Sequence, residues 1–210
     1  MDVKQGYDQW ADNYDSVVNL TRDTEAIALR NILENISFDH CLEIGCGTGK
    51  NTAWLSAKAT SVTAVDFSEE MLAKAKQKTV ATNTRFICAD ITNQWTFAKS
   101  TYDLVTFSLV LEHIRDLDHI FRQCGAVMKK GGHVYVGELH PFKQYAGSKA
   151  RFETAEGVTN LTCYTHHISE FTGAAEKNGF SLATLCEYFD DDDKRNIPRI
   201  IALLFRKNGP

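Results

Sequence analysis

Apolar residues along this chain fall into short runs separated by stretches with helical spacing. The runs are rich in β-branched and aromatic residues and predict five strands, at 41–45, 61–66, 84–90, 102–111 and 133–140. Helical spacing between the runs predicts three helices, at 50–59, 68–79 and 117–132. Near-continuous apolar strands that alternate with helices are typical of a parallel sheet covered on both faces.

The pattern changes near residue 169. A helix is predicted at 169–180, and two strands follow at 181–189 and 199–207 with no helix between them. The linking sequence DDDDKRNIP is too short for a parallel crossover, so these strands are expected to form an antiparallel hairpin. We therefore expect an α/β, doubly wound (Rossmann-like) seven-stranded sheet, mostly parallel with an antiparallel last strand and helices on both faces.

Composition and charge narrow the class of protein. The 210 residues fit one large domain or at most two small ones, and 43% hydrophobic with 24% charged residues is ordinary for a soluble protein. A net charge of −4 argues against a nucleic-acid binder, and no apolar run approaches the ~20 residues of a membrane span. The acidic, aromatic N-terminus lacks a hydrophobic signal core, and the six cysteines contain no Cys-x-x-Cys pair. These features predict a cytoplasmic protein with reduced, mostly buried thiols and no metal site.

A glycine-rich segment, GCGTG at 45–49, stands between the first strand and the first helix of this pattern. Strand, glycine loop and helix together favour a nucleotide-like ligand at the carboxyl edge of the sheet. The spacing is G-x-G-x-G followed by Lys50, whereas dinucleotide sites read G-x-G-x-x-G. A glycine triplet alone also fits a simple tight turn, so its neighbours decide the interpretation.

Three acidic residues lie close to this loop in the predicted fold. Asp66 ends the second strand, where an acid accepts hydrogen bonds from ribose hydroxyls, and Asp90 follows the third strand in the same way. Glu43 lies inside the first strand, two residues before Gly45. A carboxylate there is a poor neighbour for a pyrophosphate and suits a sulfonium or an ammonium group.

Five segments, in order and spacing, resemble the motifs of class I S-adenosylmethionine-dependent methyltransferases: LEIGCGTGKNT, VDFSEEML, CADIT, YDLVTFSLVLEHI and MKKGGHVYVGELH. The small-molecule branch, methyltransferase type 11 or 12 and UbiE-like, is the most similar. The resemblance covers roughly residues 7–206. It implies a seven-stranded fold with an antiparallel last strand, and S-adenosyl-L-methionine as cofactor with S-adenosyl-L-homocysteine as product.

The resemblance also implies roles for individual residues. It places Gly45, Cys46, Gly47 and Gly49 near the methionine part of the cofactor, with Glu43 beneath the loop and Ser108, Leu109 and Val110 on the same side. It places Asp66 on the ribose, Phe67 and Ser68 along the adenosine, and Met71, Asp90 and Ile91 at the adenine. Tyr14 in the N-terminal segment YDQWADNYD would close over the cofactor, although Tyr7, Trp10 and Tyr14 equally fit the packing of an amphipathic helix.

Methyl transfer from a sulfonium is an in-line displacement, so the protein aligns a nucleophile, excludes water and removes a proton where the nucleophile carries one. Histidine is the natural base near neutral pH. His113, His140 and His166 follow strands or precede the last helix and are the candidate bases, with Tyr14 as a further catalytic candidate. Glu138 and His140 are expected to point the same way because successive strand residues alternate faces. Each histidine also fits a packing role.

The acceptor is expected at the N-terminal helix and the irregular stretch 141–165. Basic and aromatic residues there would suit a small acceptor with a carboxylate or phosphate: Lys143, Tyr145, Lys149, Arg151, Phe152 and Tyr164. SLVLEH replaces the Asn-Pro-Pro-Tyr type of motif found in methyltransferases of nucleic-acid or glutamine amides, which favours a small molecule. Methylation of nitrogen and of oxygen both remain open. We expect no nucleic acid or membrane partner, and a monomer or homodimer.

Three alternatives remain open at this point. One is an NAD-dependent oxidoreductase, which the early third glycine, Glu43 and the closing hairpin oppose. The second is a methyltransferase-like module that binds the cofactor without catalysis, and the third is transfer of another alkyl group from a modified cofactor. For the methyltransferase we predict one domain, 1–210: N-terminal cap helices (1–37), a cofactor-binding core (38–140), a substrate-side insertion (141–168), and a C-terminal helix and β-hairpin (169–210).

Overall fold

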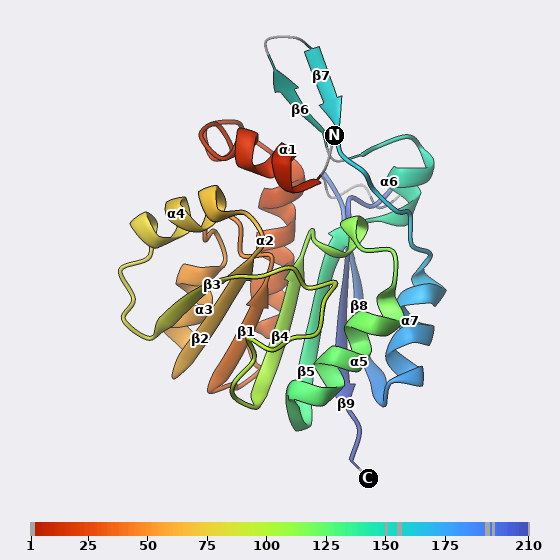
Figure 1. The fold of residues 1–210 in the computed structure, drawn as a ribbon. Coiled ribbons are helices and arrows are strands. Elements are labelled where there is room, and N and C mark those ends of the chain that lie inside the picture. The colour runs from red at the N-terminus through yellow and green to blue at the C-terminus, as the bar shows by residue number, and fades with distance from the viewer. Residues whose placement is uncertain (1–2, 150, 155–156, 192–193, 195, 210) are drawn as a thin grey trace.

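A computed structural model describes residues 3–149, 151–154, 157–191, 194 and 196–209. Its centre is a seven-stranded sheet with the strand order β3-β2-β1-β4-β5-β9-β8 (Figure 1). The strands are β1 (His40–Ile44), β2 (Ser61–Asp66), β3 (Thr84–Cys88), β4 (Tyr102–Ser108), β5 (Met128–Leu139), β8 (Phe180–Tyr188) and β9 (Ile200–Lys207). β1 to β5 are parallel, and β9 is antiparallel to both of its neighbours. The predicted fold class is confirmed.

The order of the strands reverses at β1, which pairs with β2 on one side and β4 on the other. Leu42 lies opposite Thr63 of β2 and Val105 of β4. The crossover connections leave this point in opposite directions, so the loops at the carboxyl ends of β1 and β4 separate. A crevice at this edge of the sheet follows from the topology.

Helices cover both faces of the sheet (Figure 1). They are α1 (Val3–Trp10), α2 (Leu20–Leu33), α3 (Thr52–Lys58), α4 (Glu69–Lys78), α5 (Leu117–Val127), α6 (Pro141–Tyr145), α7 (Ile168–Lys177) and the short 3-10 helix η1 (Leu111–His113). Side-chain caps fix several starts: Asn19 for α2, Ser68 for α4 and Asp116 for α5 each accept a hydrogen bond from a backbone N–H of the first turn.

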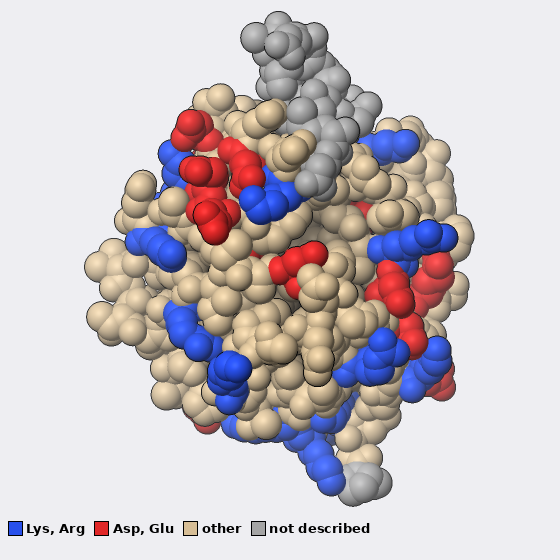
Figure 2. Space-filling view, viewed as in Figure 1, with Lys and Arg blue, Asp and Glu red and all other residues tan. Residues whose placement is uncertain are grey.

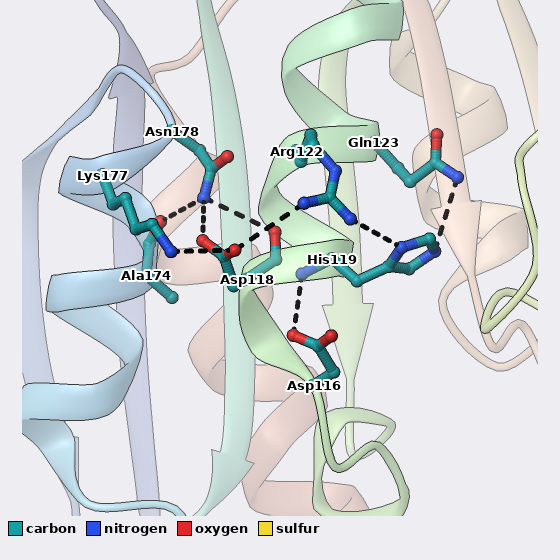
Figure 3. A network of polar contacts seen from close by, with 8 residues as sticks. All are labelled: Asp116, Asp118, His119, Arg122, Gln123, Ala174, Lys177 and Asn178. Atoms are coloured by element: carbon teal, nitrogen blue, oxygen red, sulfur yellow. Dashed lines mark hydrogen bonds and ion pairs between the residues drawn. The ribbon is translucent and has the colours of Figure 1, made fainter.

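Two apolar clusters form the core, one on each face of the sheet. α5 and α7 pack on one face, where the ring of Phe121 lies 5.9 Å from that of Phe180. α2 and α3 pack on the other, where Leu29 and Leu55 are fully buried. At the surface, the side chain of Asp118 in α5 accepts a hydrogen bond from Asn178 (2.8 Å) and pairs with Lys177 and Arg122 (Figure 3). This polar network joins α5 to the end of α7.

The helix predicted at 117–132 is shorter in the structure. α5 ends at Val127, and the following residues join β5, whose first residue, Met128, pairs with Tyr102. A side chain at Gly132 would place its Cβ 2.8 Å from the carbonyl oxygen of Asp103. Gly132 therefore permits the close approach of two strands.

The strand predicted at 102–111 also ends early, at Ser108. Leu109 has a φ of 58°, a left-handed conformation that ends the strand. The carboxylate of Glu138 accepts hydrogen bonds from the backbone N–H groups of Val110 (2.9 Å) and Leu111 (2.7 Å). A side chain on β5 thus fixes the turn after β4.

The stretch 141–164, predicted as a loop with little periodicity, contains regular structure. It holds α6, with Pro141 in the first turn, and an antiparallel hairpin of β6 (Arg151–Thr154) and β7 (Gly157–Asn160) outside the main sheet (Figure 1). The prediction that the side chains of Arg151 and Phe152 contact an acceptor falls outside the described part of the structure. Among the described residues, no helix has the length and apolar character to cross a membrane.

Candidate functional site

A cavity of about 620 Å³ lies at the carboxyl ends of β1, β2 and β4, beneath α1. Its size is that of a site for one small ligand. Most residues assigned to the cofactor by resemblance line it: Tyr14, Gly45, Gly47, Asp66, Phe67, Met71, Asp90, Ile91, Ser108, Leu109 and Val110. Figure 2 shows this face of the molecule hollowed below α1. Segments far apart in the sequence therefore meet at one crevice.

The glycines of the loop after β1 differ in what requires them. Gly45 has a φ of +69°, and a Cβ there would lie 2.2 Å from Cγ2 of Val110, so packing against the turn after β4 excludes a side chain. Gly47 has a φ of +52°, borders the cavity and has no atom within 4 Å of its Cβ position. Gly45 is required by the fold, whereas Gly47 keeps open a space that belongs to the cavity.

Asp66 joins the end of β2 to the glycine loop. Its Oδ2 accepts a hydrogen bond from the N–H of Gly47 (2.8 Å), and its Oδ1 accepts one from the N–H of Ser68 (2.9 Å). Burial raises the pKa of Asp66, and these backbone hydrogen bonds act in the opposite direction. Each carboxylate oxygen has a second acceptor position, so Asp66 can accept further hydrogen bonds from a ligand in the cavity.

Four residues assigned to the cofactor site by resemblance are not among the lining residues: Glu43, expected beneath the loop, and Cys46, Gly49 and Ser68. Glu43 accepts a hydrogen bond from the hydroxyl of Thr52 (2.6 Å), and burial raises its pKa to about 8. Ser68 caps α4, Gly49 packs against Ala75 of α4, and Cys46 belongs to the core. These residues support the loop from behind.

The N-terminal segment forms the roof of the cavity. Tyr7 and Tyr14 line it, and the segment is fastened by hydrogen bonds from Thr48 to Asp15 (2.8 Å) and from Ser68 to Asp8 (2.6 Å). Burial raises the pKa of Tyr14 to about 12, so this predicted catalytic candidate is a neutral phenol near pH 7. A neutral phenol can donate a hydrogen bond into the cavity but is a weak base.

Arg22 of α2 is a residue that the sequence motifs did not indicate. Its guanidinium lies over the ring of Tyr14, 4.1 Å from the centroid, and donates hydrogen bonds to the backbone carbonyls of Tyr14 and Val17. Among the described residues its buried Nε has no hydrogen-bond partner. The stacking holds Tyr14 over the cavity, and a basic residue in an unremarkable helix gives no local signal of such a contact.

A second unpredicted group lies behind Ser108. The side-chain amide of Asn51 donates hydrogen bonds to Glu25 (3.0 Å) and to the hydroxyl of Ser108 (3.3 Å), and the hydroxyl of Tyr135 donates to Glu25 (3.1 Å). Burial raises the pKa of Glu25 to about 7. This buried chain connects the cavity wall to α2. It joins four elements distant in sequence, α2, the start of α3, β4 and β5, so no motif could have revealed it.

The three candidate histidines occupy different places, and His113 alone among them lines the cavity. Its Nδ1 lies 2.9 Å from the carbonyl oxygen of Thr162, and its Nε2 lies 3.0 Å from the hydroxyl of Tyr7. Because a carbonyl oxygen only accepts, Nδ1 carries the proton in the neutral ring. Nε2 then presents a lone pair beside the cavity.

His140 and His166 are buried outside the cavity. Nδ1 of His140 accepts a hydrogen bond from the N–H of Phe142 (3.2 Å), Nε2 lies 3.1 Å from Oε1 of Glu187, and burial lowers the pKa of His140. Nε2 of His166 donates to the carbonyl oxygen of Ile114 (2.7 Å). In this geometry both rings connect segments of the chain. A role for either histidine as a base remains a prediction.

Comparison with known proteins agrees with this geometry. Residues 42–136 match a family model described as a methyltransferase domain. The chain is 32% identical over 139 residues to the biotin biosynthesis bifunctional protein BioHC of Cellvibrio japonicus, covering 66% of this chain and 27% of that protein. It is 30% identical over 150 residues to a ubiquinone biosynthesis O-methyltransferase of Coxiella burnetii, covering 68% of this chain and 64% of that enzyme.

A solved structure shares the fold along its whole length. The N-methyltransferase NodS of Bradyrhizobium japonicum, in complex with S-adenosyl-L-homocysteine, superposes with a TM-score of 0.75 at 16% identity, with all of both chains covered. The family match and the curated relatives confirm the resemblance to S-adenosylmethionine-dependent methyltransferases indicated by the motifs, with residues 42–136 as the matched region, and the solved structure shares the fold.

Proposed function

We propose that this chain transfers a methyl group from S-adenosyl-L-methionine to a nitrogen or oxygen atom of a small-molecule acceptor. The observation that carries the proposal is the cavity at the carboxyl ends of β1, β2 and β4. There Gly47 leaves free space at its Cβ position, and its N–H donates a hydrogen bond to the carboxylate of Asp66. The matched methyltransferase domain spans this crevice. No comparable observation favours the oxidoreductase alternative.

The lining residues fit the parts of the cofactor. The space left by Gly47 would receive the methionine part, Asp66 would accept hydrogen bonds from the ribose hydroxyls, and Asp90 with Ile91 would hold the adenine edge. When bound, this cofactor supplies a methyl group activated by a sulfonium. Tyr14, held by Arg22, would exclude water from that end of the cavity.

His113 is the candidate base that the geometry supports best. His113 lines the cavity, and its unprotonated Nε2 accepts a hydrogen bond from the hydroxyl of Tyr7. An acceptor that takes the place of this hydroxyl would give its proton to Nε2. The apolar side chain of Ile114, the residue after His113, also lines the cavity. An acceptor with an ionisable O–H or N–H group on a small apolar body would suit this end.

The charge of the chain supports a small acceptor over a nucleic acid. The net charge is −4, and Figure 2 shows basic side chains scattered among acidic and uncharged ones on the face that holds the cavity. Among the curated relatives and solved neighbours are an O-methyltransferase and an N-methyltransferase, so both acceptor atoms remain in the proposal. A cytoplasmic location and a monomeric or homodimeric state remain predictions from sequence.

A thermal-shift and calorimetric screen with S-adenosylmethionine, S-adenosylhomocysteine and NAD tests the cofactor. A ligand that binds the folded state alone stabilises it by about 2.7 kcal/mol at a hundredfold excess over Kd. We expect the two sulfur nucleotides to raise the melting temperature and NAD to leave it unchanged. Stabilisation by NAD alone would contradict the proposal.

Release of S-adenosylhomocysteine from S-adenosylmethionine, followed over a panel of small amines, phenols and hydroxy acids, tests transfer. We expect stoichiometric methylation of at least one class. Tight cofactor binding with no turnover across the panel would favour the module that binds without catalysis.

A further inference from the structure

Glu112 of η1 is a buried carboxylate whose hydrogen bonds are incomplete. Its side chain is 7% exposed, and its Oε2 has no hydrogen-bond partner among the described residues. A buried carboxylate is costly to ionise unless hydrogen bonds or a nearby positive charge compensate it. The mechanism outlined above makes no use of Glu112.

His113 is the group beside Glu112 that can become positive. Oε1 of Glu112 lies 4.0 Å from Nε2 of His113, the same nitrogen that faces the hydroxyl of Tyr7. Burial raises the pKa of Glu112, and the charge of a protonated His113 acts in the opposite direction, together with hydrogen bonds from Cys163 and Gln144. The pKa of Glu112 therefore depends on whether His113 carries a second proton.

Three other titratable groups among the described residues lie around this pair, Tyr7, Cys163 and Glu138, and none of them becomes a cation. Burial raises the pKa of Tyr7 well above its usual value, so Tyr7 stays a neutral donor to Nε2. The thiol of Cys163 lies 3.9 Å from Nδ1 of His113. Glu138 of β5 is a second buried acid, whose pKa rises to about 8 through burial and the nearby charge of Glu112.

We propose that Glu112 is a positioning residue that holds His113 ready to accept the acceptor's proton and stabilises the imidazolium that results. In this step the acceptor replaces the hydroxyl of Tyr7 as the hydrogen-bond donor to Nε2 of His113. The O–H or N–H bond of the acceptor breaks, its proton bonds to Nε2, and the electron pair stays on the acceptor atom. The carbonyl of Thr162 keeps the other proton on Nδ1 throughout. The inference rests on the proposed function, since it concerns the acceptor end of the same cavity.

Side-chain NMR of His113 tests this without knowledge of the acceptor. Long-range ¹H–¹⁵N spectra of the full chain, assigned with a His113→Asn variant, report the tautomer and the titration midpoint of this ring. We expect the neutral ring to carry its proton on Nδ1. We expect the midpoint to fall by about one pH unit in Glu112→Gln, since loss of a negative charge 4.0 Å away weakens proton binding, and to stay near the wild-type value in Glu112→Asp.

An unchanged midpoint in Glu112→Gln overturns the inference, because a purely structural role for Glu112 would alter stability without moving it. A neutral wild-type ring protonated on Nε2 also overturns it, and this measurement needs no substitution of Glu112. Titration of the same samples with S-adenosylhomocysteine distinguishes failure of the role of Glu112 from failure of the proposed function. The amide signals of Gly45 and Gly47 report whether the cofactor product binds. Shifts at these signals with an unchanged midpoint reject the role of Glu112 alone, whereas no shifts at all reject the proposed function.

Discussion

The two ends of the cavity are built in different ways. At the glycine-loop end, residues 45–49 and 66–68 are strand ends and turns, and their backbone N–H groups and left-handed glycines shape the wall. At the His113 end, side chains from distant parts of the chain meet: Tyr7 from α1, His113 from η1 and the carbonyl of Thr162. A site made of local backbone geometry depends on few residues, whereas a site made of distant side chains depends on the whole fold.

Replacement of His113 should have the largest effect, on turnover. Loss of a general base typically lowers kcat by about 10²–10⁴-fold, so we expect such a loss in His113→Asn with little change in affinity for S-adenosylhomocysteine. His140→Asn is the matched control, since it removes a buried histidine outside the cavity. Steady-state kinetics with an acceptor from the panel, beside thermal melts, measure both. Should His140→Asn lose turnover while His113→Asn keeps it, the assignment of the base must be exchanged.

Replacement of Asp66 should have the next largest effect, on cofactor affinity. Asp66→Ala removes the acceptor expected to bind both ribose hydroxyls, and we expect a loss of about 2–4 kcal/mol in the binding free energy of S-adenosylhomocysteine. Isothermal titration calorimetry measures it, with Asp12→Ala, which removes an exposed acid of the N-terminal segment, as control. Equal affinities in wild type and Asp66→Ala would remove Asp66 from the site.

Substitutions at Gly45 and Gly47 separate an effect on the stability of the fold from an effect on cofactor affinity. Gly45→Ala places a methyl group against Val110, and we expect it to lower the free energy of unfolding by about 1–3 kcal/mol. Gly47→Ala meets no protein atom, so we expect a smaller loss of stability and a clear loss of cofactor affinity. Urea unfolding and calorimetry on both variants check this. Recovery of stability in Gly45→Ala with Val110→Ala would confirm that the contact is the cause.

A pH profile of stability probes the buried acid behind the loop. The pKa of Glu43 in the folded chain is about 8, above its ordinary value of 4.5. Its contribution to stability is therefore fully present below about pH 4.5 and is lost as the pH rises towards 8. Glu43→Gln stays neutral, so the variant should gain stability relative to wild type between pH 5 and 8. Urea unfolding at several pH values tests this, and parallel profiles would show that Glu43 does not titrate in this range.

The smallest effect is expected far from both ends of the cavity. Lys177 pairs with Asp118 at the surface of α5 and α7 (Figure 3), and exposed ion pairs contribute little. Lys177→Met should leave turnover, cofactor affinity and the melting temperature close to the wild-type values. A marked loss of turnover would show that the contact between these helices matters to the acceptor end.

The sequence was informative where one short segment determines the geometry. The strand, glycine loop and helix around Gly45, with Asp66 at the next strand end, were correctly placed because a local pattern specifies them. The histidines were harder to predict because their surroundings come from distant segments. Glu138 lies near the end of β5, and His140 lies just beyond it as the N-cap of α6. Glu138 is occupied by the N–H groups of Val110 and Leu111, and His140 by Phe142 and Glu187. No periodicity in the sequence reveals such pairings.

β9 lies between β5 and β8, although it follows both in the chain. During synthesis β5 and β8 leave the ribosome first, and each would expose an unpaired edge until residues 200–207 emerge. The hydrogen bonds that attach β8 to the sheet all run through β9. We therefore expect β8 to join β5 through β9 in a late step of folding. A nascent chain halted before Ile200 should depend on chaperones to avoid aggregation.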